Sequence, residues 1–326
     1  MRKILFTLSL ILACSAMSMG WGFYGHKVIQ QLSVYALPKD MQAFYHRHMK
    51  YLVDAAVRPD ERRNTDSAEA VRHFIDVDYF GPNAVNEMPE SWAAASAKYP
   101  VDTLTKYGLV PWHVVVMQQR LTRAFQQKSV DSILFYSADL GHYIQDAHVP
   151  LHTTLNYDGQ LTDQHGLHSL WESKLPEQNL PGYSLKHKQA QYLANPEHAI
   201  WEVVRGSHKE LPNLLALEKQ VTKQFTDQTK FVVTERNGRT RKNYSDAFAK
   251  AYQEALGPMV EQRMQAAAHM TASFWFTCWV DGGRPNLKNL LATPYTKAQA
   301  KQFKQERKAW KKGQLQKKDL LLTKGR

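Results

Sequence analysis

Apolar residues along this chain recur mainly at the three- and four-residue spacing of amphipathic helices. After His26, the residues Val28, Leu32 and Tyr35 follow that spacing, and Pro38 ends the segment at about residue 37. The pattern predicts further helices at 39–56, 111–127, 129–148, 167–174, in two stretches of 186–230, and at 244–279. Since no internal repeat and no βαβ alternation occurs, the sequence predicts a mainly α, single-domain multi-helix bundle with long loops.

Three segments do not follow the helical pattern. Residues 71–78 partly alternate apolar and polar side chains, which fits a short strand or an extended or helical connection. Residues 60–63 follow Pro59 and are expected in a turn. Residues 79–101 carry Gly81, Pro82, Pro89 and Pro100, so a long loop is expected there.

The first 20 residues have the pattern of a secretory signal peptide. A basic start precedes a short apolar run at residues 4–13, and small residues lead up to Trp21. We therefore expect export to the periplasm or the medium, with cleavage after Gly20. The rival interpretation is a lipoprotein signal with lipid attached at Cys14, although Leu12 is bulkier than such sites usually carry.

Composition indicates a folded exported protein whose basicity is concentrated at one end. The net charge is +12, of which residues 296–326 carry +9 and residues 1–20 carry +2, leaving +1 for residues 21–295. We therefore predict a domain at 21–295 and a basic C-terminal tail at 296–326. The tail is expected as a solvated helix or frayed terminus, and contact with an anionic membrane or nucleic acid is the other interpretation. Only Cys278 follows the signal, so no intrachain disulfide is expected, and no obligate protein partner is evident.

Residues 141–152 carry the clearest chemical pattern. His142 and Asp146 are four apart, so they share one face of the predicted helix at 129–148. Pro150 ends that helix, and His152 follows just beyond the turn. Imidazole and carboxylate groups are the usual non-sulfur ligands of zinc, so this segment predicts a metal site; the alternative is an ordinary surface helix.

Other histidines and acids extend this pattern to two metal sites without thiolates, which suits hydrolytic zinc. His168 and Glu172 repeat the four-residue spacing, and with His152 they make one candidate set. The second candidate set is Asp60, His73, His142 and Asp146. Asp54 is the nearby alternative to Asp60 as the acidic ligand of this second set.

Taken together, these motifs resemble the three-zinc phosphodiesterase superfamily, which comprises bacterial zinc-dependent phospholipase C and the single-strand-specific nucleases. In that superfamily the mature N-terminus is a Trp whose amine and carbonyl bind zinc, with a His shortly after. Trp21 and His26 match this arrangement. The upstream acid and His, the helix motif ending in Pro-Leu-His and the downstream His-x-x-x-acid also match, over roughly residues 21–175.

The resemblance implies three zinc ions and a hydrolytic mechanism. One ion would bind the Asp60 set, a second would bind Trp21, His26 and the bridging Asp146, and a third would bind the Glu172 set. A water shared by two zinc ions would lose its proton and attack phosphorus. Asp60 could orient that water. Arg63 and Asp76 fall where the nucleases place a transition-state arginine and its aspartate partner, although an ordinary ion pair is the alternative.

The resemblance does not select one substrate. Glu172 matches the phospholipases, where nucleases usually carry Asp, and the near-neutral body also favours a phospholipase C type of enzyme acting on a phospholipid headgroup. The spacing from Trp21 to His26 and the Pro-Leu-His motif favour the alternative, a nuclease acting on single-stranded nucleic acid. A hypothesis from another class is a zinc-storing protein without turnover.

Overall fold

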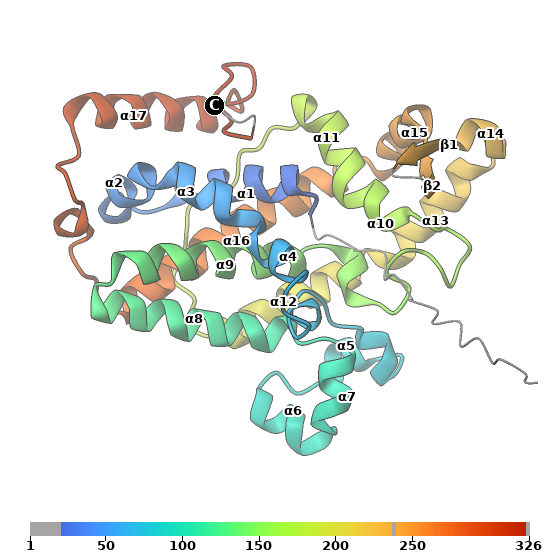
Figure 1. The fold of residues 1–326 in the computed structure, drawn as a ribbon, viewed down its shortest axis with the longest axis horizontal. Helices are drawn as coiled ribbons and strands as arrows, with labels where there is room; N and C mark the ends of the chain where they lie inside the picture. The colour runs from blue at the N-terminus through green and yellow to red at the C-terminus, as the bar shows by residue number, and fades with distance from the viewer. Residues whose placement is uncertain (1–20, 237–238, 324–326) are drawn as a thin grey trace, which may run out of the picture.

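The structure is a computed structural model that describes residues 21–236 and 239–323. The predicted signal peptide, its cleavage site and Cys14 lie outside the described residues. The described part is mainly helical, as the sequence predicts (Figure 1).

Four long helices pack together and form the core of the molecule (Figure 1). They are α1 (Phe23–Ala36), α8 (Val110–Gln127), α9 (Val130–Ala147) and α16 (Met259–Asp281). The predicted helices at 26–37, 111–127 and 129–148 correspond closely to α1, α8 and α9. Since α9 contacts the other three, almost every residue in its second half is buried.

Shorter helices surround this core. Between α1 and α8 lie α2 (Lys39–Arg47), α3 (Met49–Asp54), α4 (Arg58–Arg62), α5 (Ala84–Glu87), α6 (Trp92–Lys98) and α7 (Val101–Lys106). After α9 come α10 (Leu167–Ser169), α11 (Leu175–Asn179), α12 (Pro196–His208), α13 (Leu211–Thr222), α14 (Asp227–Lys230) and α15 (Asp246–Leu256). Figure 1 shows α6 and α7 projecting beyond the bundle.

Several local expectations differ from the structure. The expected helix at 39–56 breaks at His48, and the expected turn at 60–63 belongs largely to the short helix α4. Residues 71–78 form 3₁₀ turns with an extended link, and the expected loop at 79–101 contains the whole of α5 and α6. The expected helix at 244–279 is divided at Gly257-Pro258, because proline removes a backbone donor and glycine here has a φ of 58°.

The C-terminal half also contains an unexpected hairpin. Within the described ranges, the one sheet is the antiparallel pair β1 (Phe231–Arg236) and β2 (Arg239–Tyr244), with Phe231 opposite Tyr244. Residues 186–194, expected to begin a helix, are without regular structure.

The basic C-terminal segment is not simply a solvated helix. Its helix α17 (Lys297–Lys311) buries Phe303 and Trp310 against the ring of Tyr35 on α1. Thr296 and Gln299 form a capping box at its start. One face of the segment therefore belongs to the core, while its lysines remain exposed.

None of the helices in the described ranges combines the length and apolar character needed to cross a bilayer.

Candidate metal centre

The centre is organised by the C-terminal end of α9. His142 and Asp146 are one turn apart, and both are fully buried because α1 and α8 pack on either side of this helix. Residue 148 caps the helix, and the 3₁₀ turn Pro150–Thr153 then carries His152 back toward the same region. In the structure, the helix is therefore followed by Pro150 and then His152, in the order that the sequence predicts.

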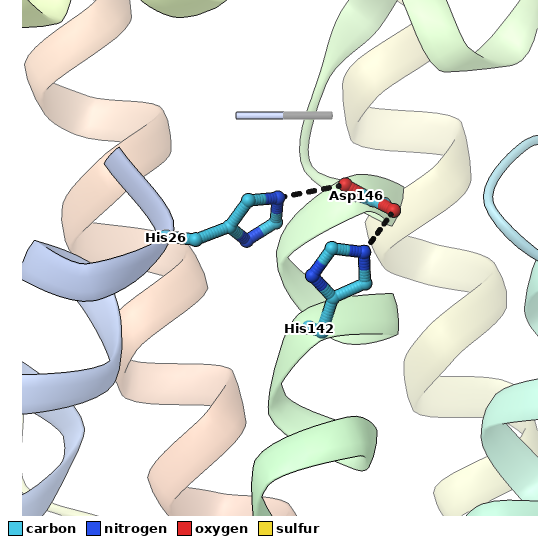
Figure 2. Close-up of side chains that lie close together, drawn as sticks. All are labelled: His26, His142 and Asp146. Carbon is cyan, nitrogen blue, oxygen red and sulfur yellow. Dashed lines mark ion pairs between the residues drawn. The ribbon is translucent and has the colours of Figure 1, made fainter. Parts of the chain in front are cut away.

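The first group of side chains consists of His26, His142 and Asp146 (Figure 2). Asp146 Oδ1 lies 3.3 Å from His26 Nε2, and Asp146 Oδ2 lies 3.2 Å from His142 Nε2. On the opposite side of its ring, His26 Nδ1 donates to Gln145 Oε1 at 2.7 Å. This bond places the hydrogen on Nδ1 and leaves the Nε2 lone pair directed at the group.

The second group consists of Asp60, His73 and His142. His73 Nδ1 lies 3.1 Å from His142 Nε2, and Asp60 Oδ1 lies 3.7 and 3.8 Å from these two nitrogens. Asp146 Oδ2 also approaches His73 Nδ1, at 2.8 Å. His142 Nδ1 donates to the carbonyl of Ala56. Asp146 therefore lies between the first two groups.

The third group consists of His152, His168 and Glu172. His168 Nε2 lies 2.8 Å from Glu172 Oε2 and 2.9 Å from His152 Nε2. His152 Nδ1 donates to the carbonyl of His73, which connects this group to the second. Glu172 lies in a π-helical turn (Leu170–Lys174), a form of backbone that often occurs at functional sites.

The chemistry of these side chains fits zinc. Their donor atoms are imidazole nitrogens and carboxylate oxygens, with no thiolate. Several of these buried atoms have no hydrogen-bond partner among the described residues: His26 Nε2, both oxygens of Asp60, Asp146 Oδ1 and Glu172 Oε2. Buried polar atoms without partners are costly, and coordination to a cation would satisfy them.

The pKa values indicate which of these buried side chains would carry a proton when no metal ion is bound. Burial lowers the pKa of His142, but Asp146 and Asp60 outweigh this effect and raise the pKa to about 9. Burial raises the pKa of Glu172 to about 8 and lowers that of His168 to about 4. Because metal ligands must be deprotonated, metal binding here would release protons.

Trp21 lies beside these groups at the start of the described chain. Its buried indole donates to the carbonyl of Gln145 at 2.8 Å and its ring packs against Trp171 at 4.9 Å. The backbone of Gly22 donates to the carbonyl of Glu172. These contacts hold the beginning of α1 between the first and third groups. The ligand role of the Trp21 amine and carbonyl stays a prediction.

The family resemblance predicts that Arg63 and Asp76 act as a pair. Arg63 Nη1 lies 3.7 Å from Asp60 Oδ1, so the guanidinium is beside the second group. Asp76 is buried, and burial, with the charge of Asp78 adding to it, raises its pKa to about 7. The pairing of these two residues stays a prediction.

Three further side chains support the centre, and none of them belongs to the motifs that predict it: Glu69, Arg62 and Tyr143. Glu69 is buried and accepts hydrogen bonds from Arg62 and from the hydroxyl of Tyr143. Arg62 also contacts Asp139, which pairs with Arg58. The four-residue spacing from Glu69 to His73 is a signal that could have identified Glu69, whereas the contacts with α9 depend on the fold.

A family model and a known protein are similar to this chain. The family model described as S1/P1 Nuclease matches residues 21–273, which include all the side chains of the three groups. Nuclease S1 of Aspergillus oryzae is 25% identical to this chain over 191 residues, covering 53% of this chain and 61% of the fungal protein. The aligned region is thus under two thirds of that relative. Both matches are to nucleases, which corrects the preference for the phospholipase form.

Proposed function

The chain belongs to the S1/P1 nuclease family, and from this we propose that it is a zinc-dependent phosphodiester hydrolase acting on single-stranded nucleic acid. The observation that carries the proposal is the position of Asp146. One of its oxygens faces His26 and the other faces His73 and His142. A carboxylate placed in this way can serve two metal ions at once, as a multinuclear hydrolytic centre requires.

We assign one zinc ion to His26 and Asp146, a second to Asp60, His73, His142 and the shared Asp146, and a third to the third group. Trp21 would complete the first set through its backbone amine and carbonyl. Bound zinc would lower the pKa of a water molecule and neutralise negative charge on the phosphoryl group. The proposed ligands are Trp21, His26, Asp60, His73, His142, Asp146, His152, His168 and Glu172.

Asp60 and Arg63 are the proposed residues that act on the reactants themselves. Both carboxylate oxygens of Asp60 are buried without hydrogen-bond partners among the described residues. One of them would accept a hydrogen bond from the attacking water, orient it toward phosphorus and take up its proton. The guanidinium of Arg63, next to Asp60, would donate to the phosphoryl oxygens as their charge increases. Asp76 would hold Arg63 in place.

The presence of Glu instead of Asp at position 172 does not by itself distinguish a phospholipase from a nuclease. Its carboxylate reaches His168 Nε2 from a π-helical turn, where the backbone differs from the regular helix that the spacing alone implies. The length of this side chain can therefore reflect the local backbone as well as the class of enzyme. Family membership favours nucleic acid, so hydrolysis of a phospholipid becomes an outcome that the test must exclude.

We also propose that the protein is exported, with residues 1–20 removed after Gly20. Support comes from the basic and apolar pattern of that segment. Mass analysis of the mature protein would identify the first residue. A mature chain that begins with a lipidated Cys14 would contradict the proposal.

The function is tested with purified protein reconstituted with zinc. We expect about three zinc ions per chain and cleavage of single-stranded DNA and RNA, with no release of phosphocholine from phosphatidylcholine vesicles. Fewer than two zinc ions per chain would contradict the metal assignment. Phosphocholine release with intact nucleic acid would instead identify a phospholipase C.

A matched pair of variants tests the site. Asp60→Asn should lower kcat/KM about 100-fold or more, because it removes the proposed proton acceptor. Asp54→Asn changes the neighbouring, exposed aspartate that pairs with Lys50 and should leave kcat/KM unchanged. Equal effects of the two substitutions would contradict the assignment.

A further inference from the structure

An aromatic cluster lies where the ends of α6 and α7 meet the 3₁₀ turn Val77–Phe80. The rings of Tyr79 and Tyr107 are stacked, with centroids 3.4 Å apart and planes inclined by 16°. Phe80 packs edge-on against Tyr79, Tyr99 and Tyr107 at 5.3, 5.0 and 6.1 Å. Tyr79 is 45% exposed, so the stack ends at the surface of the molecule. We call these four residues the aromatic platform.

Two exposed lysines flank the platform. Lys106 Nζ lies 5.0 Å from the ring centre of Tyr107, and Lys98 Nζ lies 5.1 Å from that of Tyr99. Neither forms an ion pair with another residue in the ranges that the structure describes. Both positive charges are therefore available to an anionic ligand that lies across the rings.

Backbone contacts attach the platform to the segment that carries His73. Asp76 N donates to the carbonyl of Tyr107 at 2.7 Å. Gly108, with a φ of 100°, lies so close to the carbonyl of Phe74 that a Cβ atom would be 2.2 Å from its oxygen. This glycine permits the chain after α7 to pack directly on the segment next to His73.

A second set of contacts joins the platform to the third metal-binding group. Ile75 N donates to the carbonyl of His152 at 2.9 Å. The carboxylate of Asp78, next to Tyr79, accepts hydrogen bonds from Thr154 Oγ1 at 2.6 Å and from Leu155 N at 3.0 Å. The platform is therefore held in a fixed position relative to His73 and His152.

From this arrangement we propose that the aromatic platform is a stacking site for an unpaired base of the nucleic-acid substrate, with Lys98 and Lys106 contacting the phosphates on either side. The inference rests on the proposed function and assigns it a substrate subsite. Base stacking on aromatic rings combined with lysine contacts is how single strands are bound without strong sequence preference. A base inside a duplex has both faces covered by its neighbours, so this site selects single strands.

The same charges argue against a lipid headgroup at the platform. Aromatic rings can hold a quaternary ammonium group through cation–π interactions. Here two ammonium groups already lie beside the rings of Tyr99 and Tyr107, and they would repel a third cation. A phosphate-bearing strand has the complementary charge.

The test compares a thymidine oligonucleotide with an abasic oligonucleotide of equal length, using the zinc-loaded protein. Tyr79→Ala should raise KM about tenfold for the base-bearing strand and have little effect on KM for the abasic strand. Tyr79→Trp should restore the lower KM. Tyr192→Ala is the control, because this tyrosine is 49% exposed and bonds to Asp281 away from the platform. An equal effect of Tyr79→Ala on both strands would overturn the proposal.

Lys106→Gln provides a second measurement that does not depend on Tyr79. It should weaken binding to both strands and reduce the slope of log affinity against log salt by about one. An unchanged slope would remove Lys106 from the site. Failure of the proposed function is distinguishable, because wild-type protein would then hydrolyse bis(p-nitrophenyl) phosphate while leaving both oligonucleotides intact.

Discussion

Glu69 lies behind His73, on the side of the ring that faces away from the metal-binding groups. Its Oε1 is 3.5 Å from His73 Nε2, whereas His73 Nδ1 is 2.8 Å from Asp146. Although burial raises the pKa of Glu69, the nearby His73 and the hydrogen bonds from Arg62 and Tyr143 outweigh it and hold the pKa well below its usual value. A carboxylate in this position orients the imidazole and increases its basicity toward a metal.

We therefore expect Glu69→Gln to weaken zinc binding by about 10- to 100-fold, because the neutral amide orients His73 less strongly. Competition with a chromogenic chelator would measure the affinity directly, without reference to turnover. Glu61→Gln, an exposed acid on α4, is the control and should bind zinc like the wild type. Unchanged affinity in Glu69→Gln would show that Glu69 only stabilises the fold.

A second prediction concerns the amine of Trp21. Because the Trp21 side chain is fully buried beside Gln145 and Trp171, the backbone of residue 21 cannot move far from the first group. A chain that starts at Trp21 should bind about three zinc ions, whereas one with a single added glycine should lose about one ion and most of its activity. Metal analysis by mass spectrometry checks this. Full zinc content in the extended chain would contradict the ligand role of the amine.

A third prediction tests the packing of the C-terminal helix. Trp310 is 1% exposed, and its ring lies 6.3 Å from that of Tyr35. Trp310→Ala should lower the free energy of unfolding by about 3–5 kcal/mol, as expected for loss of a buried aromatic ring. Lys308→Ala, on the exposed face of the same helix, should change it by no more than about 0.5 kcal/mol. Denaturant unfolding measures both. A small effect of Trp310→Ala would contradict this packing and favour the solvated helix expected from the sequence.

Spacing along the chain predicts contacts that lie within one helix. His142 and Asp146 meet because residues four apart share a helix face, and His152 follows from the position of Pro150. The same argument pairs His168 with Glu172, although it cannot anticipate the π-helical turn in which Glu172 lies.

Residue spacing does not predict contacts between segments that are distant in the sequence. Glu69 and Tyr143 are 74 residues apart, and they meet only because α9 packs against the segment before His73. The burial of Trp310 against Tyr35 depends on the return of the chain to α1. The hairpin had a local signal, since Asn237-Gly238 between two strand-like segments favours a tight turn. The surrounding helical pattern obscured it.

The last prediction concerns Asp76, whose pKa in the folded protein is raised from 3.8 to about 7 by burial and by the charge of Asp78. Between these values the folded state retains a proton that the unfolded chain releases, so the stability contributed by this carboxyl falls as pH rises from about 4 to about 7. Asp76→Asn cannot ionise, so it should unfold at a higher temperature than the wild type at pH 8, and the difference should disappear near pH 4. Calorimetry of both proteins measures this. A lower midpoint for Asp76→Asn at pH 8 would mean that a cation stabilises the ionised Asp76, so that its proposed contact with Arg63 is an ion pair and not a hydrogen bond to a neutral carboxyl.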